Sequence, residues 1–156
     1  MKFLKTDGDQ LVFQLGRREK DIFSELLKMY PVVPTSHHRI SQETDSPAGQ
    51  ANQALLEEAL TDHRKEKKLE LEAMMADPAR FQQIPGGSRL RLTAYELEWL
   101  LQVLNDVRVG CWLNLGSPDE KLGTIPRLNA QNAHNLWAME LCGHFEACFL
   151  AALEQS

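Results

Sequence analysis

A chain of 156 residues is long enough for one domain with a single hydrophobic core. Hydrophobic residues make up 43% of it and charged residues 25%, a composition typical of soluble globular proteins. The net charge of −5 disfavours binding to DNA or RNA, because contacts with phosphates require a basic surface.

The first fifteen residues predict a β-hairpin. Apolar and polar residues alternate on both sides of Asp7-Gly8, and this dipeptide is a strong short-range signal for a tight turn between strands. The strands are expected near Lys2–Thr6 and Gln10–Leu15. Because an isolated hairpin is only marginally stable, this one should pack on the helices that follow.

Two helices and a long loop are predicted next. The first helix covers about Arg17–Tyr30 and ends before a proline. Residues 31–50 contain three prolines and no periodicity, so we expect a long loop and the most mobile segment of the chain. A second helix runs over about Asn52–Met75, and a short helical piece follows at Asp77 and Pro78.

Two long helices are predicted in the second half. Thr93 followed by Glu96 is a capping box that begins a helix ending near Leu115. After a second loop, the last helix starts at Asn129 or Asn132 and ends near residue 154. The predicted architecture is therefore one mainly α domain, residues 1–156: a small bundle of four or more helices with an N-terminal β-hairpin and no other sheet.

Cysteine usage and hydropathy predict a cytoplasmic protein. The three cysteines form no CxxC pair and lie in apolar helical patterns, as reduced core thiols do: Cys111, Cys142 and Cys148. The start, MKFLKTDGD, becomes polar before the apolar region of a signal peptide could form. Glu140, His144 and Glu146 interrupt the most apolar helix, so no membrane span is expected. The sequence carries no signal of oligomeric state.

The second helix contains the densest charge run, DHRKEKK at residues 62–68, and this run allows two interpretations. It is either a solvent-exposed helix whose long side chains cover apolar surface, or its middle, at His63 and Lys67, spans a groove open to a partner. Nucleic acid is disfavoured as that partner because acidic residues neutralise the same helix: Glu57, Glu58, Glu66, Glu70 and Glu72.

Patterns typical of catalysis or metal binding are incomplete. Glu140, His144 and Cys148 recur at i, i+4 and i+8, but no second cluster supplies further ligands, so we expect neither a metal nor a cofactor. Cysteine and histidine pairs can be proposed, yet no oxyanion-hole loop or orienting third residue accompanies them. The PGG at residues 85–87 lacks the strand and the Lys-Ser/Thr of a phosphate loop. Catalysis is therefore not indicated.

The most informative single residue is Arg108, which falls on the apolar face of the third helix. A buried guanidinium needs acceptors, and we expect Glu140 of the last helix to supply them, with Trp112 stacked alongside. Asp106 points away on the same helix. The structural interpretation is an ion pair that fixes the register of the two helices. The functional one is a cleft that binds a peptide carboxylate or another anion.

The segment VLNDVRVGCWLNLG, together with LWAMELCGHFEACFLAALE, resembles an uncharacterised bacterial family best known from actinobacteria, domain-of-unknown-function family two-thousand-seventeen. The family's Leu-Asn-Asp-apolar-Arg pattern is matched by Leu104, Asn105, Asp106 and Arg108, and the resemblance spans most of the chain. The chain departs from the family in its long loop after Tyr30. The family has no assigned activity, but its genes often lie beside that of the Clp-protease adaptor, which implies a link to regulated proteolysis.

The sequence thus predicts a non-enzymatic, adaptor-type module that binds another protein and neither nucleic acid nor membranes. The alternative is an enzyme or small-anion-binding protein with a cleft around Asn105, Asp106 and Arg108. The residues expected at a ligand or partner site are these three with Glu140 and His144.

Overall fold

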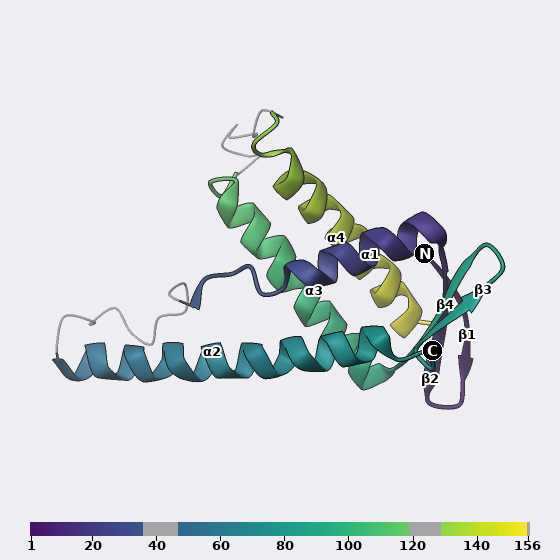
Figure 1. Ribbon diagram of the computed structural model, residues 1–156, viewed down its shortest axis with the longest axis horizontal. Helices are drawn as coiled ribbons and strands as arrows, with labels where there is room; N and C mark the ends of the chain where they lie inside the picture. The colour runs from purple at the N-terminus through teal and green to yellow at the C-terminus, as the bar shows by residue number, and fades with distance from the viewer. Residues whose placement is uncertain (36–46, 119–128, 156) are drawn as a thin grey trace.

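The structure, a computed structural model, describes residues 1–35, 47–118 and 129–155 (Figure 1). These residues form a mixed fold of four helices and one four-stranded antiparallel sheet. The elements in chain order are β1 (Lys2–Asp7), β2 (Gln10–Gly16), α1 (Arg17–Met29), α2 (Pro47–Ala76), β3 (Phe81–Ile84), β4 (Gly87–Thr93), α3 (Ala94–Asn114) and α4 (Ala133–Leu153). The predicted helices and N-terminal hairpin are confirmed, whereas the expectation of no other sheet is wrong.

The first hairpin turns where the sequence predicts it. Asp7 pairs with Gln10 across the turn, and Gly8 has a positive φ of 67°, a conformation that glycine adopts at little cost. β2 is buried through Leu11, Val12, Phe13 and Leu15, whereas β1 is the largely exposed edge strand.

A second hairpin, β3–β4, completes the sheet in the order β1-β2-β4-β3. β4 pairs with β2 from Gln10↔Thr93 to Gly16↔Gly87, so strands about 75 positions apart in sequence lie side by side. The predicted short helical piece at Asp77 and Pro78 is instead a turn that leads into β3, in which the Ala79 amide donates to the Asp77 carboxylate at 2.8 Å.

The core forms where the sheet meets α1, α3 and α4. Phe13 of β2 and Phe149 of α4 meet edge to face with ring centroids 5.2 Å apart, and Phe23 of α1 packs on Phe145 at 5.0 Å. α3 and α4 lie along each other (Figure 1). α3 begins with the predicted capping box, in which Thr93 and Glu96 satisfy each other's backbone amides.

α2 is a 30-residue helix whose C-terminal part packs on the body through Leu71 and Met74. Its N-terminal half extends away from the sheet end of the molecule (Figure 1). The helix begins at Pro47, five residues before the predicted start, because proline is well suited to the first helical position. The predicted loop is shorter accordingly, and its centre, residues 36–46, lies outside the described residues.

Within the described part of the chain, α4 alone has the length and apolar composition of a membrane-crossing helix. Cys142, Phe145, Phe149 and Ala152 of α4 are buried inside the fold. A third of the apolar window of α4 is buried, so packing in the core accounts for part of its apolar character.

Candidate functional site

The five residues predicted to form a site lie on two helices and make separate contacts. Asn105 is exposed on α3, and Glu140 and His144 are exposed on α4. Asp106 and Arg108, also on α3, contact different elements, as described next. The structure therefore does not gather the five residues around one cleft.

Asp106 of α3 forms hydrogen bonds with the segment that follows α1. Its carboxylate accepts the backbone N–H of Val32 at 2.7 Å and that of Val33 at 3.3 Å. Arg64 of α2 joins the same group, with its guanidinium 3.6 Å from Asp106 and donating to the Val33 carbonyl at 2.5 Å. The Asp106 and Arg64 side chains are only 15% and 12% exposed. This polar cluster therefore joins α1, α2 and α3.

Replacing Asp106 with alanine should lower the free energy of unfolding by about 1–2 kcal/mol, because two amides and the Arg64 guanidinium lose their acceptor. Hydrogen exchange at the Val32 and Val33 amides should become faster than in the wild type. The exposed neighbour Asn105 provides the control, since Asn105→Ala should change stability by less than about 0.5 kcal/mol. Unchanged exchange at Val32 would contradict the assignment.

The acceptor of Arg108 is Glu146, not Glu140. The Arg108 guanidinium nitrogen Nη1 lies 2.9 Å from Glu146 Oε2. The expectation of a largely buried Arg108 is also wrong, because half of its side chain is exposed while the Glu146 side chain is 11% exposed. The pairing does join α3 to α4, as the structural interpretation predicts.

The Arg108 side chain lies against Gly143 of α4. A Cβ atom at this position would lie 3.7 Å from Nε of Arg108, so the guanidinium lies over the backbone of α4. Trp112, expected beside Arg108, instead donates its indole N–H to the Pro118 carbonyl at 3.0 Å. The arginine is held by the carboxylate of Glu146, three positions after Gly143 on α4.

Glu146 is a buried carboxylate with one partner. Burial raises its pKa above the ordinary value, and the charge and hydrogen bond of Arg108 act in the opposite direction. Its second oxygen, Oε1, is buried with no hydrogen-bond partner among the described residues. Burial, reinforced by the nearby Glu146, raises the pKa of the Cys142 thiol to about 12, so this cysteine stays protonated and is not an activated nucleophile.

The predicted i, i+4 spacing does bring His144 and Cys148 together on α4. The sulfur lies 3.9 Å from Nε2 of His144. Within the described residues, no group of three or more His, Cys, Asp or Glu side chains is placed to hold a metal ion.

The middle of α2 covers a small pocket beside Asp106. The pocket has a volume of about 120 Å³ and is lined by Tyr30, His63, Lys67, Trp99, Gln102, Val103 and Asp106. The Lys67 ammonium lies 5.6 Å from the centre of the Trp99 ring and 2.8 Å from the Glu70 carboxylate. Burial, together with the charge of Asp106, raises the pKa of Tyr30. The space is too small for a protein segment.

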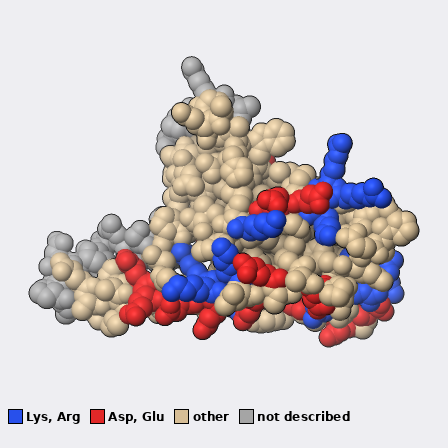
Figure 2. Space-filling view, viewed as in Figure 1, with Lys and Arg blue, Asp and Glu red and all other residues tan. Residues whose placement is uncertain are grey.

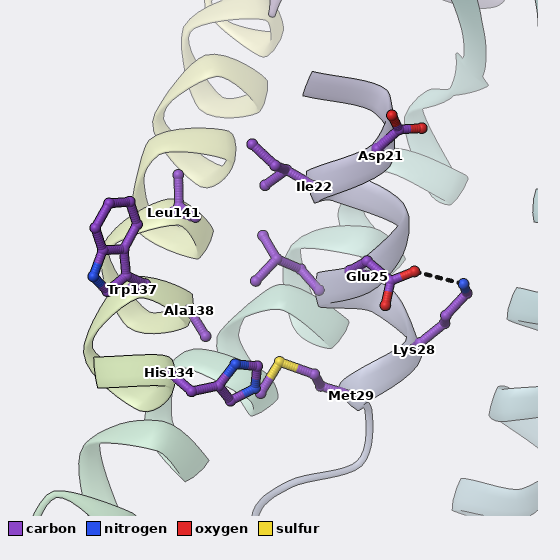
Figure 3. A pocket seen from close by; sticks show the side chains of 10 residues that line it. Asp21, Ile22, Glu25, Lys28, Met29, His134, Trp137, Ala138 and Leu141 are labelled. Atoms are coloured by element: carbon purple, nitrogen blue, oxygen red, sulfur yellow. Dashed lines mark hydrogen bonds and ion pairs between the residues drawn. The ribbon is translucent and has the colours of Figure 1, made fainter. Parts of the chain in front are cut away.

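A larger groove lies between α1 and α4 (Figure 3). Its volume is about 540 Å³, and apolar side chains from both helices line it: Ile22, Leu26, Met29, Trp137, Ala138 and Leu141. Trp137 is 63% exposed and Ile22 38% exposed. Asp21, Glu25 and Lys28 lie along the α1 side, and Glu25 pairs with Lys28 at 2.7 Å. This groove combines a recessed apolar floor with an exposed indole.

The sequence patterns do not single out this groove, because Trp137 is one exposed residue at the edge of an apolar helix. The helical projection of α4 does show that Trp137 lies beside the buried stripe, because it is about 100° from the buried Ala138. Only the packing of α1 shows that this flank borders a neighbouring helix.

A scan of protein-family models, a search of curated proteins and a search of solved structures find no match to this chain.

Proposed function

We propose that this chain is a non-enzymatic, adaptor-type module that binds another protein in the α1–α4 groove. The observation that carries the proposal is the exposed Trp137 beside an apolar groove of about 540 Å³. Apolar surface gains about 25 cal/mol for each Å² that a partner removes from water. Tryptophan is among the residues that most often dominate protein–protein interfaces.

The alternative, an enzyme or anion-binding cleft around Asn105, Asp106 and Arg108, has less support. The Asp106 carboxylate is engaged by two amides and Arg64, and the Arg108 guanidinium is engaged by Glu146. Both groups have internal structural partners, and these partners belong to different parts of the fold.

The setting that we propose for this module is regulated proteolysis, which the sequence resemblance described above implies. We also propose the cytoplasm as its compartment, because Cys111, Cys142 and Cys148 are all free thiols, as is usual in a reducing environment. We therefore place the proposed partner in the cytoplasm.

The test uses the photo-crosslinking residue p-benzoylphenylalanine in place of Trp137 in the native host. Crosslinked proteins are identified by mass spectrometry, and the candidate partner is purified and titrated against wild-type chain and Trp137→Ala. We expect Trp137→Ala to bind the partner at least about tenfold more weakly than the wild type does, while its unfolding transition stays the same.

Tyr95 provides the matched control, because it is an aromatic residue of 71% exposure on α3 that does not line the groove. Crosslinking from Tyr95 should not capture the same partner, and Tyr95→Ala should keep full affinity. Equal capture from both positions, or full affinity of Trp137→Ala, would contradict the proposal.

A further inference from the structure

The sheet has an inner face that packs on the helices and an outer face that carries several basic residues. Along β2 and β4, residues of the core alternate with residues of the outer face. The cross-strand register places Lys5 of β1 and Arg91 of β4 on either side of Val12. Arg89 lies on the same face, two positions before Arg91. Basic side chains therefore gather at the sheet end of a chain with a net charge of −5, in blue at the right of Figure 2.

A pocket of about 300 Å³ opens on the outer face, lined by Leu4, Lys5, Val12, Arg89 and Arg91. Its rim is accessible, because the side chains of Lys5 and Arg91 are 61% and 30% exposed and Leu4 is 38% exposed. Val12 is 1% exposed, so it lies beneath the cations and is not available to a ligand. The groups that a ligand can contact are therefore the charged ends of the basic side chains, with Leu4 beside them.

The pocket holds more positive charge than the protein balances, because among the described residues no carboxylate lines it. Asp7 reaches its rim with one oxygen, Oδ2, which lies 3.3 Å from Lys5 Nζ and 3.4 Å from Arg91 Nη1. Both contacts are long and exposed, and such pairs bind weakly. In the described part of the chain Arg89 has no ion pair, and its Nε has no hydrogen-bond partner. Asp7 thus balances one of the three positive charges and leaves the other two unbalanced.

We propose that this pocket binds a small molecule that carries a phosphate monoester group. Such a group has a charge of about −1.5 to −2 at neutral pH, which matches the two unbalanced cations, whereas a carboxylate supplies only one negative charge. A guanidinium presents paired N–H donors whose geometry fits two phosphate oxygens. Because Arg89 and Arg91 are two positions apart on one strand, their backbones lie about 7 Å apart on the same face, and both side chains can reach one phosphate.

A compact phosphate suits the pocket better than a polyanionic polymer or a membrane. A long polyanion would extend beyond the basic patch and meet the field of a chain with a net charge of −5. No aromatic side chain lines the pocket in the described structure, so nucleic-acid bases have no surface on which to stack. A volume of about 300 Å³ is at the lower end of the range for small-molecule sites. The pocket shares no lining residue with the α1–α4 groove, so this site goes beyond the proposed function and each can fail without the other.

The experiment titrates the isotope-labelled full chain with phenyl phosphate at neutral pH and constant ionic strength, and follows backbone amide and arginine Nε–H signals by NMR. We expect saturable shifts of the signals of Val12, Arg89 and Arg91. Phenyl sulfate has the same shape and one negative charge fewer, so it should bind at least about fivefold more weakly than phenyl phosphate.

Two sets of variants locate the site. Arg89→Gln with Arg91→Gln should weaken the binding of phenyl phosphate by about tenfold or more, because the paired N–H donors are lost. Arg17→Gln with Arg18→Gln is the matched control, since it removes two positive charges from exposed positions of α1 outside the pocket and should keep the affinity. Lys5→Gln, at a position of 61% exposure, should weaken binding by about threefold or more and leave urea unfolding unchanged, which separates loss of binding from loss of folding.

Absence of saturable shifts, equal binding of phenyl sulfate, or an equal loss of affinity in the control variant would overturn the proposal. A phosphoserine peptide, a short single-stranded RNA and phosphatidylserine vesicles are titrated in parallel. If one of these bound more tightly than phenyl phosphate and depended on Arg89 and Arg91, the outer face would belong to that class of partner and the small-molecule proposal would be wrong.

Discussion

Replacing Gly110 with alanine is expected to destabilise the protein by about 2–3 kcal/mol, a cost typical of an overpacked core. In an ordinary helix the same substitution stabilises by about 1 kcal/mol. Here a Cβ atom would lie 2.4 Å from Cβ and Cγ1 of Val32 and 2.9 Å from the Val32 carbonyl carbon. Because Asp106 holds the Val32 backbone at 2.7 Å, the segment cannot move aside without losing that hydrogen bond.

Gly143→Ala is the matched control in a long helix of the same fold. Its added methyl group would meet only Arg108, at 3.7 Å and beyond, which is ordinary van der Waals contact. We expect this variant to be as stable as the wild type or more stable by up to about 1 kcal/mol in urea unfolding. If Gly110→Ala were equally well tolerated, the segment after α1 would not be packed against α3 as described.

Local sequence signals predicted the elements that local interactions determine. The Asp7-Gly8 turn and the Thr93–Glu96 capping box each satisfy backbone groups within a few residues, and both are present. The β3–β4 hairpin was missed because β3 is short and two of its four residues are glutamine. Leu90 and Leu92 alternate with arginines, which is the pattern of a strand with one buried face. The hydrogen-bonding partner of β4 is the distant β2, however, and no local pattern shows that pairing.

The sequence predicted the side of α3 on which Arg108 lies, but not the turn of α4 that Arg108 contacts. Helical projection placed Arg108 correctly on the side of α3 that meets α4. It could not show which turn of α4 lies opposite, because the axial offset of two helices depends on their packing. Glu146 follows Cys142 by four residues and precedes Phe149 by three, so it is a carboxylate on the buried stripe of α4. The helical projection that places Arg108 on the apolar face of α3 also identifies Glu146 as a carboxylate on the apolar face of α4.

Arg108→Met should destabilise the protein by about 2–3 kcal/mol at pH 7, because it leaves the buried carboxyl group of Glu146 without its donor. A fully buried pair would cost more, about 3–5 kcal/mol, but half of the Arg108 side chain is exposed to water. Loss of the arginine also removes both contributions that lower the pKa of Glu146, so burial raises that pKa further.

The pH dependence of this loss follows from the direction of the shift. A carboxyl group whose pKa is higher in the folded chain favours folding below its unfolded pKa, and this contribution is lost as the pH rises through the folded value. The destabilisation by Arg108→Met should therefore shrink as the pH falls from 7, because the raised pKa of Glu146 means that this carboxyl group becomes protonated above the ordinary glutamate value. Urea unfolding at several pH values measures it.

A double-mutant cycle separates Glu146 from the carboxylate that the sequence favoured. In a Glu146→Gln background, Arg108→Met should cost less than about 1 kcal/mol and lose its pH dependence, since no buried charge is left to strand. In a Glu140→Gln background the full cost should remain, because Glu140 is exposed on α4 while the Arg108 guanidinium is bound 2.9 Å from Glu146. Coupling to Glu140 instead of Glu146 would mean that α3 and α4 pack in a different register, with the turn of α4 that carries Glu140 opposite Arg108.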